Sequence, residues 1–302
     1  MDTAIATDRL TKRYGSRAAV TDLSLRVPEG CVYGFLGPNG SGKSTTMKML
    51  LSLIRPTTGE VHILGRAMTR RTRRSLLGQI GSLIESPPGY AHLTGQENMR
   101  LVGRLLDLPP RQIDWAGDTV RLRRHMSKRV RDYSLGMKQR LGIAMALARA
   151  PRILILDEPT NGLDPAGIEE IRDLLRTLAE AGVTGMVSSH LLGEIDRTAT
   201  VLGIVSEGRL IFQGSRQQLL SESTPDVLIR CSDPIGARAV VERRGHHWQP
   251  DAGTIRIGGL GEEATARTVS SLVEADIDVF EVRRDEQSLE DVFKDLTAGA
   301  GL

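Results

Sequence analysis

A glycine-rich segment that ends in Lys43 and Ser44 carries the strongest chemical signal in the sequence. Gly37 and Gly42 give the spacing Gly-x-x-x-x-Gly-Lys-Ser, directly after the apolar run Val32–Leu36 and before a helical pattern. Glycines let the backbone curl so that successive N–H groups and the next helix N-terminus face an anion. A lysine at this position adds a point charge. The segment is predicted to bind the phosphates of a nucleotide.

Each residue type in this loop suits one task. We expect Lys43 to reach the β- and γ-phosphates and the hydroxyl of Ser44 to bind Mg²⁺. A glycine turn that precedes a helix by chance is the alternative, but the order strand, loop, helix is the one that phosphate binding requires. The predicted nucleotide-binding residues here are Gly37, Pro38, Asn39, Gly40, Ser41, Gly42, Lys43, Ser44 and Thr45.

Two adjacent carboxylates follow a second apolar run. Ile153–Leu156 leads directly into Asp157 and Glu158, which places both at the carboxyl end of a buried strand, where ligands bind in α/β sheets. Because neighbouring strand residues point to opposite sides, the two can take different roles. We expect Asp157 to hold Mg²⁺ through water and Glu158 to polarise the water that attacks the γ-phosphate. Such a pair is usually only solvated, and the phosphate loop makes this one specific.

A second helix start that could face an anion lies between these motifs. Ser134 opens the segment Ser-Leu-Gly-Met-Lys-Gln-Arg, immediately before the helical run Leu141–Ala150. As an isolated feature Ser134 would be an N-cap. A helix N-terminus without its own lysine also suits a site shared between two nucleotide-binding surfaces.

The elements around these motifs predict an α/β fold. Short β-branched runs alternate with helical patterns through the first two-thirds of the chain, which is typical of a largely parallel sheet. Ile5–Leu10 and Val20–Val27 alternate like half-exposed strands and predict an antiparallel β flap. A helical insert is expected over about residues 93–140, opened by a capping box from Thr94 to Glu97.

The sequence pattern changes after Gly214. Residues 221–225 read as a linker, followed by short strand and helix patterns. We therefore predict a nucleotide-binding domain of residues 1–220 and a small accessory α+β domain of residues 221–302. Nothing in the accessory domain suggests catalysis, and His246 and His247 beside Trp248 read as loop residues without further metal ligands at suitable spacing.

Composition narrows the function classes. The chain has 302 residues with 40 basic and 37 acidic side chains, a net charge of +3, which is too balanced to argue for nucleic-acid binding. Two arginine-rich stretches, 66–74 and 121–131, could touch phospholipid head groups or nucleic acid. Solvated helix faces are the favoured interpretation, because no aromatic residues are interleaved.

Compartment is predicted from what the sequence lacks. No apolar run approaches the roughly 20 residues that span a bilayer, and no secretory signal is visible, so we expect a cytoplasmic chain. Cys31 and Cys231 are far apart without metal-ligand spacing and are predicted to be free, buried thiols.

Taken together, these motifs resemble the ATP-binding cassette (ABC) family over roughly Ile5–Gly214. The family's motifs appear in order: Walker A at Gly37–Thr45, the signature at Ser134 and Gly136, Walker B at Ile153–Glu158, the D-loop at Asn161–Asp164 and the switch histidine at His190. Tyr14 stands where the family stacks an aromatic ring on adenine, which suits its π-face.

The resemblance implies an ATPase that uses ATP and Mg²⁺ in a head-to-tail dimer. ATP would lie between Walker A of one copy and Ser134 and Gly136 of the other, with Asp164 near the nucleotide and His190 sensing the γ-phosphate. A separate multi-span membrane permease would be the second partner. The chain would then sit on the inner face of the cell membrane, and no nucleic-acid partner is expected.

The sequence departs from the family pattern at three positions. Leu135 and Met137 replace the usual glycine and glutamine of the signature, and Glu85 replaces a glutamine. Glutamate can still approach Mg²⁺ or its water as an oxygen ligand, so Glu85 is predicted to lie near the metal.

Glu85 and the ending Ser288–Phe293 look like the bacterial exporter branch with bacitracin-resistance and lantibiotic-immunity subunits. This resemblance implies export of an antibiotic, peptide or lipid-like compound. The alternative is a soluble ABC factor acting on ribosomes or DNA, which generally needs two fused cassettes or a long coiled-coil insert. A regulatory module with weak turnover is a third possibility, which the retained Glu158 and His190 oppose.

Overall fold

The chain forms two compact units in a computed structural model that describes residues 2–195, 197–221, 225–251, 254–285 and 289–299. The first unit comprises Met1–Arg216 together with Leu296–Leu302, and the second comprises Gln217–Asp295. Residues 222–224 of the predicted linker lie outside the described residues.

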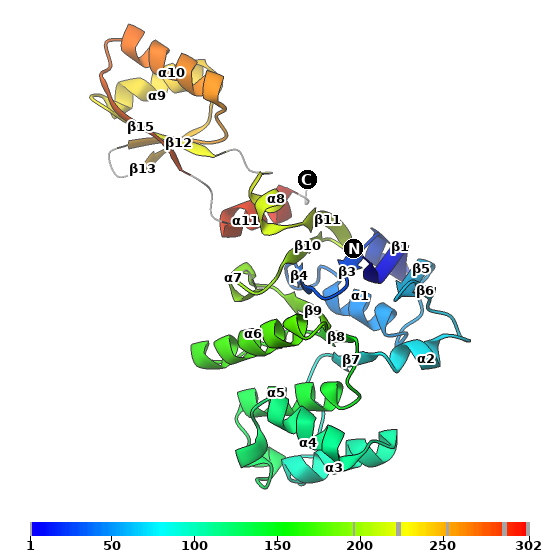
Figure 1. Cartoon of the computed structure of the whole chain (residues 1–302). Coiled ribbons are helices and arrows are strands. Elements are labelled where there is room, and N and C mark those ends of the chain that lie inside the picture. The colour runs from blue at the N-terminus through cyan, green and yellow to red at the C-terminus, as the bar shows by residue number, and fades with distance from the viewer. Residues whose placement is uncertain (1, 196, 222–224, 252–253, 286–288, 300–302) are drawn as a thin grey trace. The chain divides into compact units, whose positions relative to one another are not determined.

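A six-stranded sheet forms the centre of the first unit (Figure 1). Its order is β11-β10-β4-β9-β8-β7, parallel throughout except for the antiparallel pair of β10 and β11. The predicted parallel sheet is thus confirmed. The strands are β4 (Val32–Leu36), β7 (Ile80–Leu83), β8 (Ile153–Leu156), β9 (Thr184–Ser189), β10 (Val201–Ser206) and β11 (Arg209–Gly214).

The predicted antiparallel flap is also present. β1 pairs with β2, β3 and β5, and β5 pairs with β6. The buried hydroxyl of Thr7 donates to the Leu23 carbonyl (2.7 Å) and accepts from the Leu25 N–H (2.8 Å), so the bend between β2 and β3 keeps its polar groups satisfied. The strands are β1 (Thr3–Tyr14), β2 (Arg17–Leu23), β3 (Arg26–Pro28), β5 (Thr58–Ile63) and β6 (Arg66–Ala67).

Helices connect several strands of the first unit. A hydrophobic core unites the flap, the central sheet and α1, and includes Tyr33, Phe35 and Met47, all fully buried. The helices of the first unit outside the insert are α1 (Lys43–Leu50), α2 (Arg73–Leu77), α6 (Pro165–Glu180) and α7 (Leu192–Ile195), and α8 (Arg216–Ser221) begins at the boundary between the two units.

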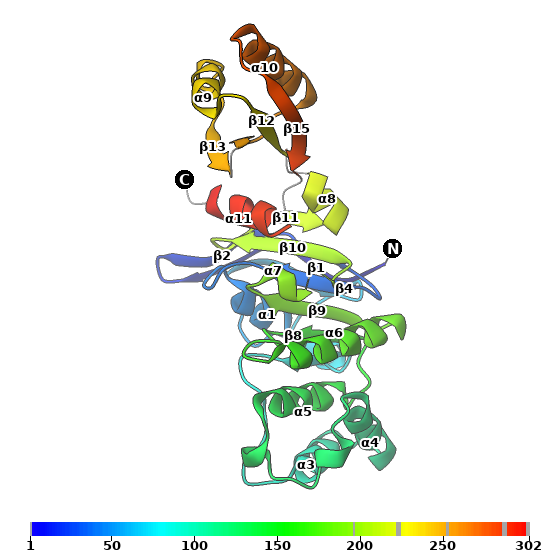
Figure 2. The same cartoon turned by 90° about the vertical axis from the view of Figure 1, so that its left-hand side faces the viewer.

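The predicted helical insert lies between β7 and β8 (Figures 1 and 2). The Glu97 N–H donates to the Thr94 hydroxyl (3.1 Å), and the Thr94 N–H donates to the Glu97 carboxylate (2.7 Å). These hydrogen bonds also hold the pKa of Glu97 below its usual value. The insert comprises α3 (Gly95–Leu106), α4 (Pro110–Thr119), the 3₁₀ turns Arg123–His125 and Val130–Asp132, and α5 (Leu135–Leu147).

The second unit has the strand and helix order βαββαβ. Its sheet is antiparallel in the order β13-β14-β12-β15, which is the ferredoxin-like arrangement. His246 and His247 precede β13 and belong to no helix or strand, whereas Trp248 begins a strand that the sequence patterns did not indicate and pairs with Ile257 on β14. The elements are β12 (Asp226–Cys231), α9 (Pro234–Arg243), β13 (Trp248–Asp251), β14 (Thr254–Ile257), α10 (Glu262–Glu274) and β15 (Val279–Asp285), followed by α11 (Leu289–Gly299).

The sequence predicts that both cysteines are free and buried. Cys31 and Cys231 are both free and buried, and burial raises the pKa of Cys31 to about 11.

Among the described residues, no helix has the length and apolar character needed to cross a membrane.

The capping box predicts a local contribution to stability. Thr94→Ala should lower the free energy of unfolding by about 1 kcal/mol, because the Glu97 N–H loses its acceptor. A thermal melt followed by circular dichroism should show a decrease of about 2–4 °C. Thr119→Ala, within α4, serves as the matched control. An equal loss in both variants would contradict a specific capping contribution.

Candidate functional site

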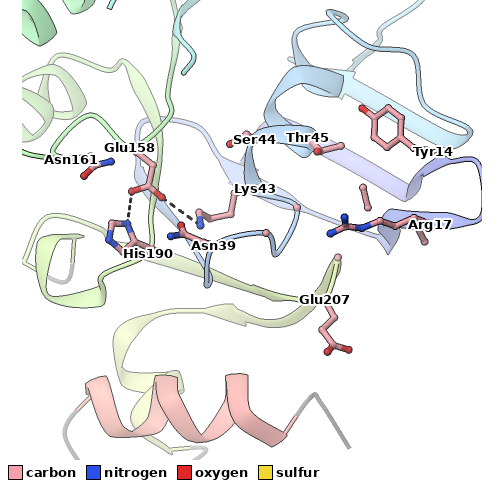
Figure 3. Close-up of a pocket in the computed structure, with 15 residues that line it drawn as sticks. Tyr14, Arg17, Asn39, Lys43, Ser44, Thr45, Glu158, Asn161, His190 and Glu207 are labelled. Carbon is pink, nitrogen blue, oxygen red and sulfur yellow. Dashed lines mark hydrogen bonds and ion pairs between the residues drawn. The ribbon is translucent and has the colours of Figure 1, made fainter. Parts of the chain in front are cut away.

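An open cavity of about 960 Å³ lies beside the loop that joins β4 to α1 (Figure 3). The carboxyl ends of β8 and β9 deliver Glu158 and His190 to the same cavity. Sequence positions more than a hundred residues apart therefore meet, because parallel strands end at one edge of the sheet. The predicted residues that line it are Tyr14, Asn39, Gly40, Gly42, Lys43, Ser44, Thr45, Glu158 and His190.

Glycine is required at two points of the loop. A Cβ atom on Gly37 would lie 2.2 Å from the Val205 carbonyl oxygen and 2.6 Å from the Ser41 hydroxyl oxygen. Gly42 has φ +100° and its Cβ would meet the Ala19 carbonyl oxygen at 2.6 Å, a conformation that side chains rarely adopt. The loop is therefore held in a tight curl immediately before α1.

The ammonium group of Lys43 is buried inside this curl. The side chain is 6% exposed, and Nζ donates to the carbonyls of Gly37 (2.6 Å) and Pro38 (3.2 Å). The Glu158 carboxylate lies 3.5 Å from the same nitrogen. A buried cation needs such partners, and a phosphate oxygen could replace the carboxylate.

Glu158 occupies the centre of the charged cluster. One carboxylate oxygen faces Lys43, and the other lies 2.8 Å from Nδ1 of His190 (Figure 3). Glu158 has φ +49°, which is uncommon for a residue with a side chain and is often found at functional sites. The backbone is strained here while the carboxylate is directed into the cavity.

Ser188 on β9 joins the two carboxylate residues and was missed by the sequence analysis. Its buried hydroxyl donates to the Asp157 carboxylate (2.6 Å) and accepts from the Glu158 N–H (2.9 Å). It thus fixes the orientation of Asp157 and holds the strained backbone of Glu158. A serine near the end of a strand-like run is the sequence signal for this role.

The polar groups at the loop between β4 and α1 suit a bound anion together with a metal cation. The Ser41 hydroxyl is buried, and within the described part of the chain it has no hydrogen-bond partner. Ser44 lines the cavity, and Asp157 is only 5% exposed. Hydroxyl and carboxylate oxygens suit Mg²⁺, so Ser44 and Asp157 fit the predicted metal.

Tyr14 lies at the open side of the cavity, 53% exposed, with the Lys12 ammonium 4.9 Å from its ring centroid. About half of the side chain is therefore exposed to solvent at the cavity. The cavity is also lined by Arg17 and Glu207, which carry no motif in the sequence, and by Asn161, the first residue of the D-loop. None of the three was predicted to line the site. Figure 3 places Arg17 near Tyr14 and Asn161 near Glu158.

Other predicted residues lie outside this cavity. Ser134 accepts a hydrogen bond from the Met137 N–H (3.3 Å) as the N-cap of α5, and Asp164 accepts one from the Gly167 N–H (3.0 Å) as the N-cap of α6. Gly136 lies in the first turn of α5, where a Cβ would be 3.6 Å from the Leu163 side chain. The three residues therefore belong to a surface distinct from the Lys43 site.

Glu85 is paired with a lysine of α1. Its carboxylate contacts the Lys48 ammonium, and it is 66% exposed. It is not among the residues that line the cavity. The structure therefore brings Glu85 to α1, and its predicted contact with the metal remains a prediction.

Fold and site define a nucleoside triphosphatase with a phosphate-binding loop between a strand and a helix. The family described as ABC transporter matches residues 20–161. The bacitracin transport ATP-binding protein BcrA of Bacillus licheniformis is 40% identical over 305 aligned residues, covering 99% of each chain. The chain belongs to the ABC transporter family as an ATP-binding, ATP-hydrolysing subunit, as the sequence motifs predict.

Two further similarities agree with this assignment. The lantibiotic transport ATP-binding protein SrtF of Streptococcus pyogenes is 43% identical, over 68% of this chain and 87% of its own. A dimeric ATP-binding cassette bound to ADP and Pi is 26% identical with a TM-score of 0.62, covering 70% of this chain and 98% of that one. A second family, described as an AAA domain and putative AbiEii toxin, matches residues 127–196.

Ser188 provides a test of the site that is independent of the family motifs. Ser188→Ala should lower MgATP turnover about tenfold, because a buried carboxylate and a backbone N–H lose their partner. ATP affinity without Mg²⁺, measured by calorimetry, should change less than about twofold. Ser82→Ala, an exposed serine on β7, is the matched control. Unchanged turnover of Ser188→Ala would rule out the positioning role.

Proposed function

We propose that this chain powers the export of an antibiotic, peptide or lipid-like compound through a separate multi-span permease. The observation that carries the proposal is the Glu158 carboxylate held between Lys43 and His190 inside the cavity. Retention of this hydrolytic cluster favours a motor over a regulatory module. The relatives BcrA and SrtF are named as transport ATP-binding proteins, which favours transport.

Lys43 and the loop N–H groups would hold the β- and γ-phosphates of ATP. The anion would then serve as the counter-charge of Lys43 and release the carboxylate of Glu158. Glu158, still oriented by His190, could accept a hydrogen bond from a water and place it for attack on the γ-phosphate. Tyr14 would stack on the adenine.

Ser44 and Asp157 would hold Mg²⁺ next to the phosphates. When bound, this ion neutralises part of the negative charge that builds up on the phosphate oxygens. Asp157 receives its own orientation from the Ser188 hydroxyl, so the carboxylate is directed before any ligand arrives. Glu85 would approach the metal only after leaving Lys48.

A second copy of the chain would complete the site. Ser134 and Gly136 open α5 and lie outside the cavity of their own copy. A helix N-terminus favours a negative charge, and the exposed Leu135 (45%) leaves this end accessible. In a head-to-tail dimer, α5 of one copy would face the γ-phosphate held by Lys43 of the other, with Asp164 close to the same interface.

The location follows from the partner. A chain that drives a permease would lie in the cytoplasm, on the inner face of the cell membrane. The rival function, a soluble factor acting on ribosomes or DNA, finds no counterpart in the relatives described above, which are named for transport.

Permease-coupled hydrolysis tests this function. MgATP turnover of the purified chain should rise when its candidate permease is added in detergent. Glu158→Gln should then reduce the turnover at least about a hundredfold, because the group that positions the water is lost. Turnover that the permease does not change, but that ribosomes or DNA increase, would overturn the proposal.

The matched comparison is Lys43→Ala, which separates binding from hydrolysis. Glu158→Gln should keep its affinity for ATP, whereas Lys43→Ala should bind ATP at least about tenfold more weakly, because the phosphates lose their charge-assisted partner. Calorimetric titration distinguishes the two, and an intact affinity in Lys43→Ala would contradict the placement of the phosphates.

A further inference from the structure

We propose that one edge of the first unit binds the head groups of anionic phospholipids. The surface, here named the arginine ridge, consists of Arg66, Arg70, Arg71, Arg73 and Arg74. It runs from β6 to the start of α2, at the right-hand edge of the first unit in Figure 1. The inference rests on the proposed function, which brings the chain to a membrane surface.

The ridge carries a positive charge that the surrounding sequence does not offset. No Asp or Glu occurs from Val61 to Ile84. All five arginines are exposed, and none forms an ion pair within the described residues. Glu60, the acidic residue that precedes this segment, lies 3.7 Å from His62. Five positive charges therefore face solvent together, although the whole chain has a net charge of only +3.

The second arginine-rich stretch, by contrast, has acidic side chains beside it. In the second arginine-rich stretch, Arg123 lies 2.8 Å from Asp118 and Arg131 lies 3.8 Å from Asp132. Both arginines lie in the 3₁₀ segments that follow α4, and not on the helix face that the sequence predicted. The contrast distinguishes the arginine ridge from the general abundance of arginine in this protein.

The ridge is held in a fixed conformation. The Thr72 hydroxyl donates to the Ala67 carbonyl (2.6 Å) and accepts from the Thr69 N–H (2.9 Å). Met68 and Leu77 pack against the hydrophobic core, and Leu76 is part of it. Apolar side chains thus hold the segment against the core while the arginines are exposed to solvent. Because the backbone is already fixed, binding a ligand costs little backbone entropy.

Guanidinium groups recognise phosphate by paired, charge-assisted hydrogen bonds. A row of them without interleaved aromatic side chains lacks the stacking platform of a single-stranded nucleic-acid site. A negatively charged membrane surface attracts such clusters through their summed charge. An anionic lipid head group is therefore the ligand that this chemistry fits best.

Vesicle co-sedimentation of the full-length chain tests the proposal. Vesicles of phosphatidylglycerol mixed with phosphatidylcholine should bind the wild-type chain, and vesicles of phosphatidylcholine alone should not. The fourfold change R70Q, R71Q, R73Q and R74Q should weaken binding to the mixed vesicles at least about 100-fold. Changing the same four arginines to lysine should retain most of the binding, because the charge is kept.

The matched control removes the same charge from the second arginine-rich stretch. R124Q, K128Q, R129Q and R131Q change residues that are also exposed and should leave vesicle binding within about threefold of wild type. An equal loss of vesicle binding in both fourfold variants would overturn the proposal. It would also be overturned if the wild-type chain bound equally well to vesicles with and without phosphatidylglycerol. Tighter binding of a single-stranded RNA oligonucleotide than of mixed vesicles would also overturn it.

Two readouts separate this proposal from the proposed function and from misfolding. The ridge variant should keep its thermal midpoint and its permease-stimulated ATPase in lipid-free detergent, because the ridge does not line the nucleotide cavity. Stimulated turnover without any wild-type vesicle binding would refute the ridge and leave the motor function standing. If inorganic phosphate abolishes vesicle binding at millimolar concentration, the ridge is a phosphate site and the lipid proposal is wrong.

Discussion

A buried ammonium group is the constraint on which the rest of the site depends. Taking Lys43 out of water costs several kcal/mol unless anions and carbonyls surround it. The curl of the loop supplies the Gly37 and Pro38 carbonyls, and β8 supplies the carboxylate of Glu158. On the proposed function, a phosphate bound at Lys43 would replace the Glu158 carboxylate as counter-charge, and this exchange would link nucleotide binding to hydrolysis.

The parallel sheet makes this exchange possible because it brings distant segments to one edge. Glu158 follows β8, His190 follows β9, and the two strands are direct neighbours. Ser188, at the end of β9, ties the strand to Asp157 and to the backbone of Glu158. The strain in the left-handed backbone of Glu158 is thus offset by a hydrogen bond from the next strand.

Sequence alone predicted the parts of this arrangement that depend on local pattern. The phosphate loop, the strand before Asp157 and the capping box at Thr94 follow from spacing and periodicity. Contacts between strands do not, because a serine such as Ser188 looks the same whether it binds a carboxylate or packs in the core. The pairing of Glu85 with Lys48 and the strand at Trp248 were missed for the same reason, since tertiary partners determine them.

On the proposed function, Lys43 of one copy and Ser134 of a second copy hold the same ATP molecule. Sedimentation velocity of the slowly hydrolysing Glu158→Gln chain tests it most directly. We expect a dimer with MgATP and a monomer with MgADP. Adding Ser134→Arg should leave a monomer with MgATP, because the larger charged side chain blocks the N-terminus of α5. A monomer that binds MgATP tightly with Ser134 intact, or a dimer that persists after Ser134→Arg, would show that the two copies do not share the nucleotide in this way.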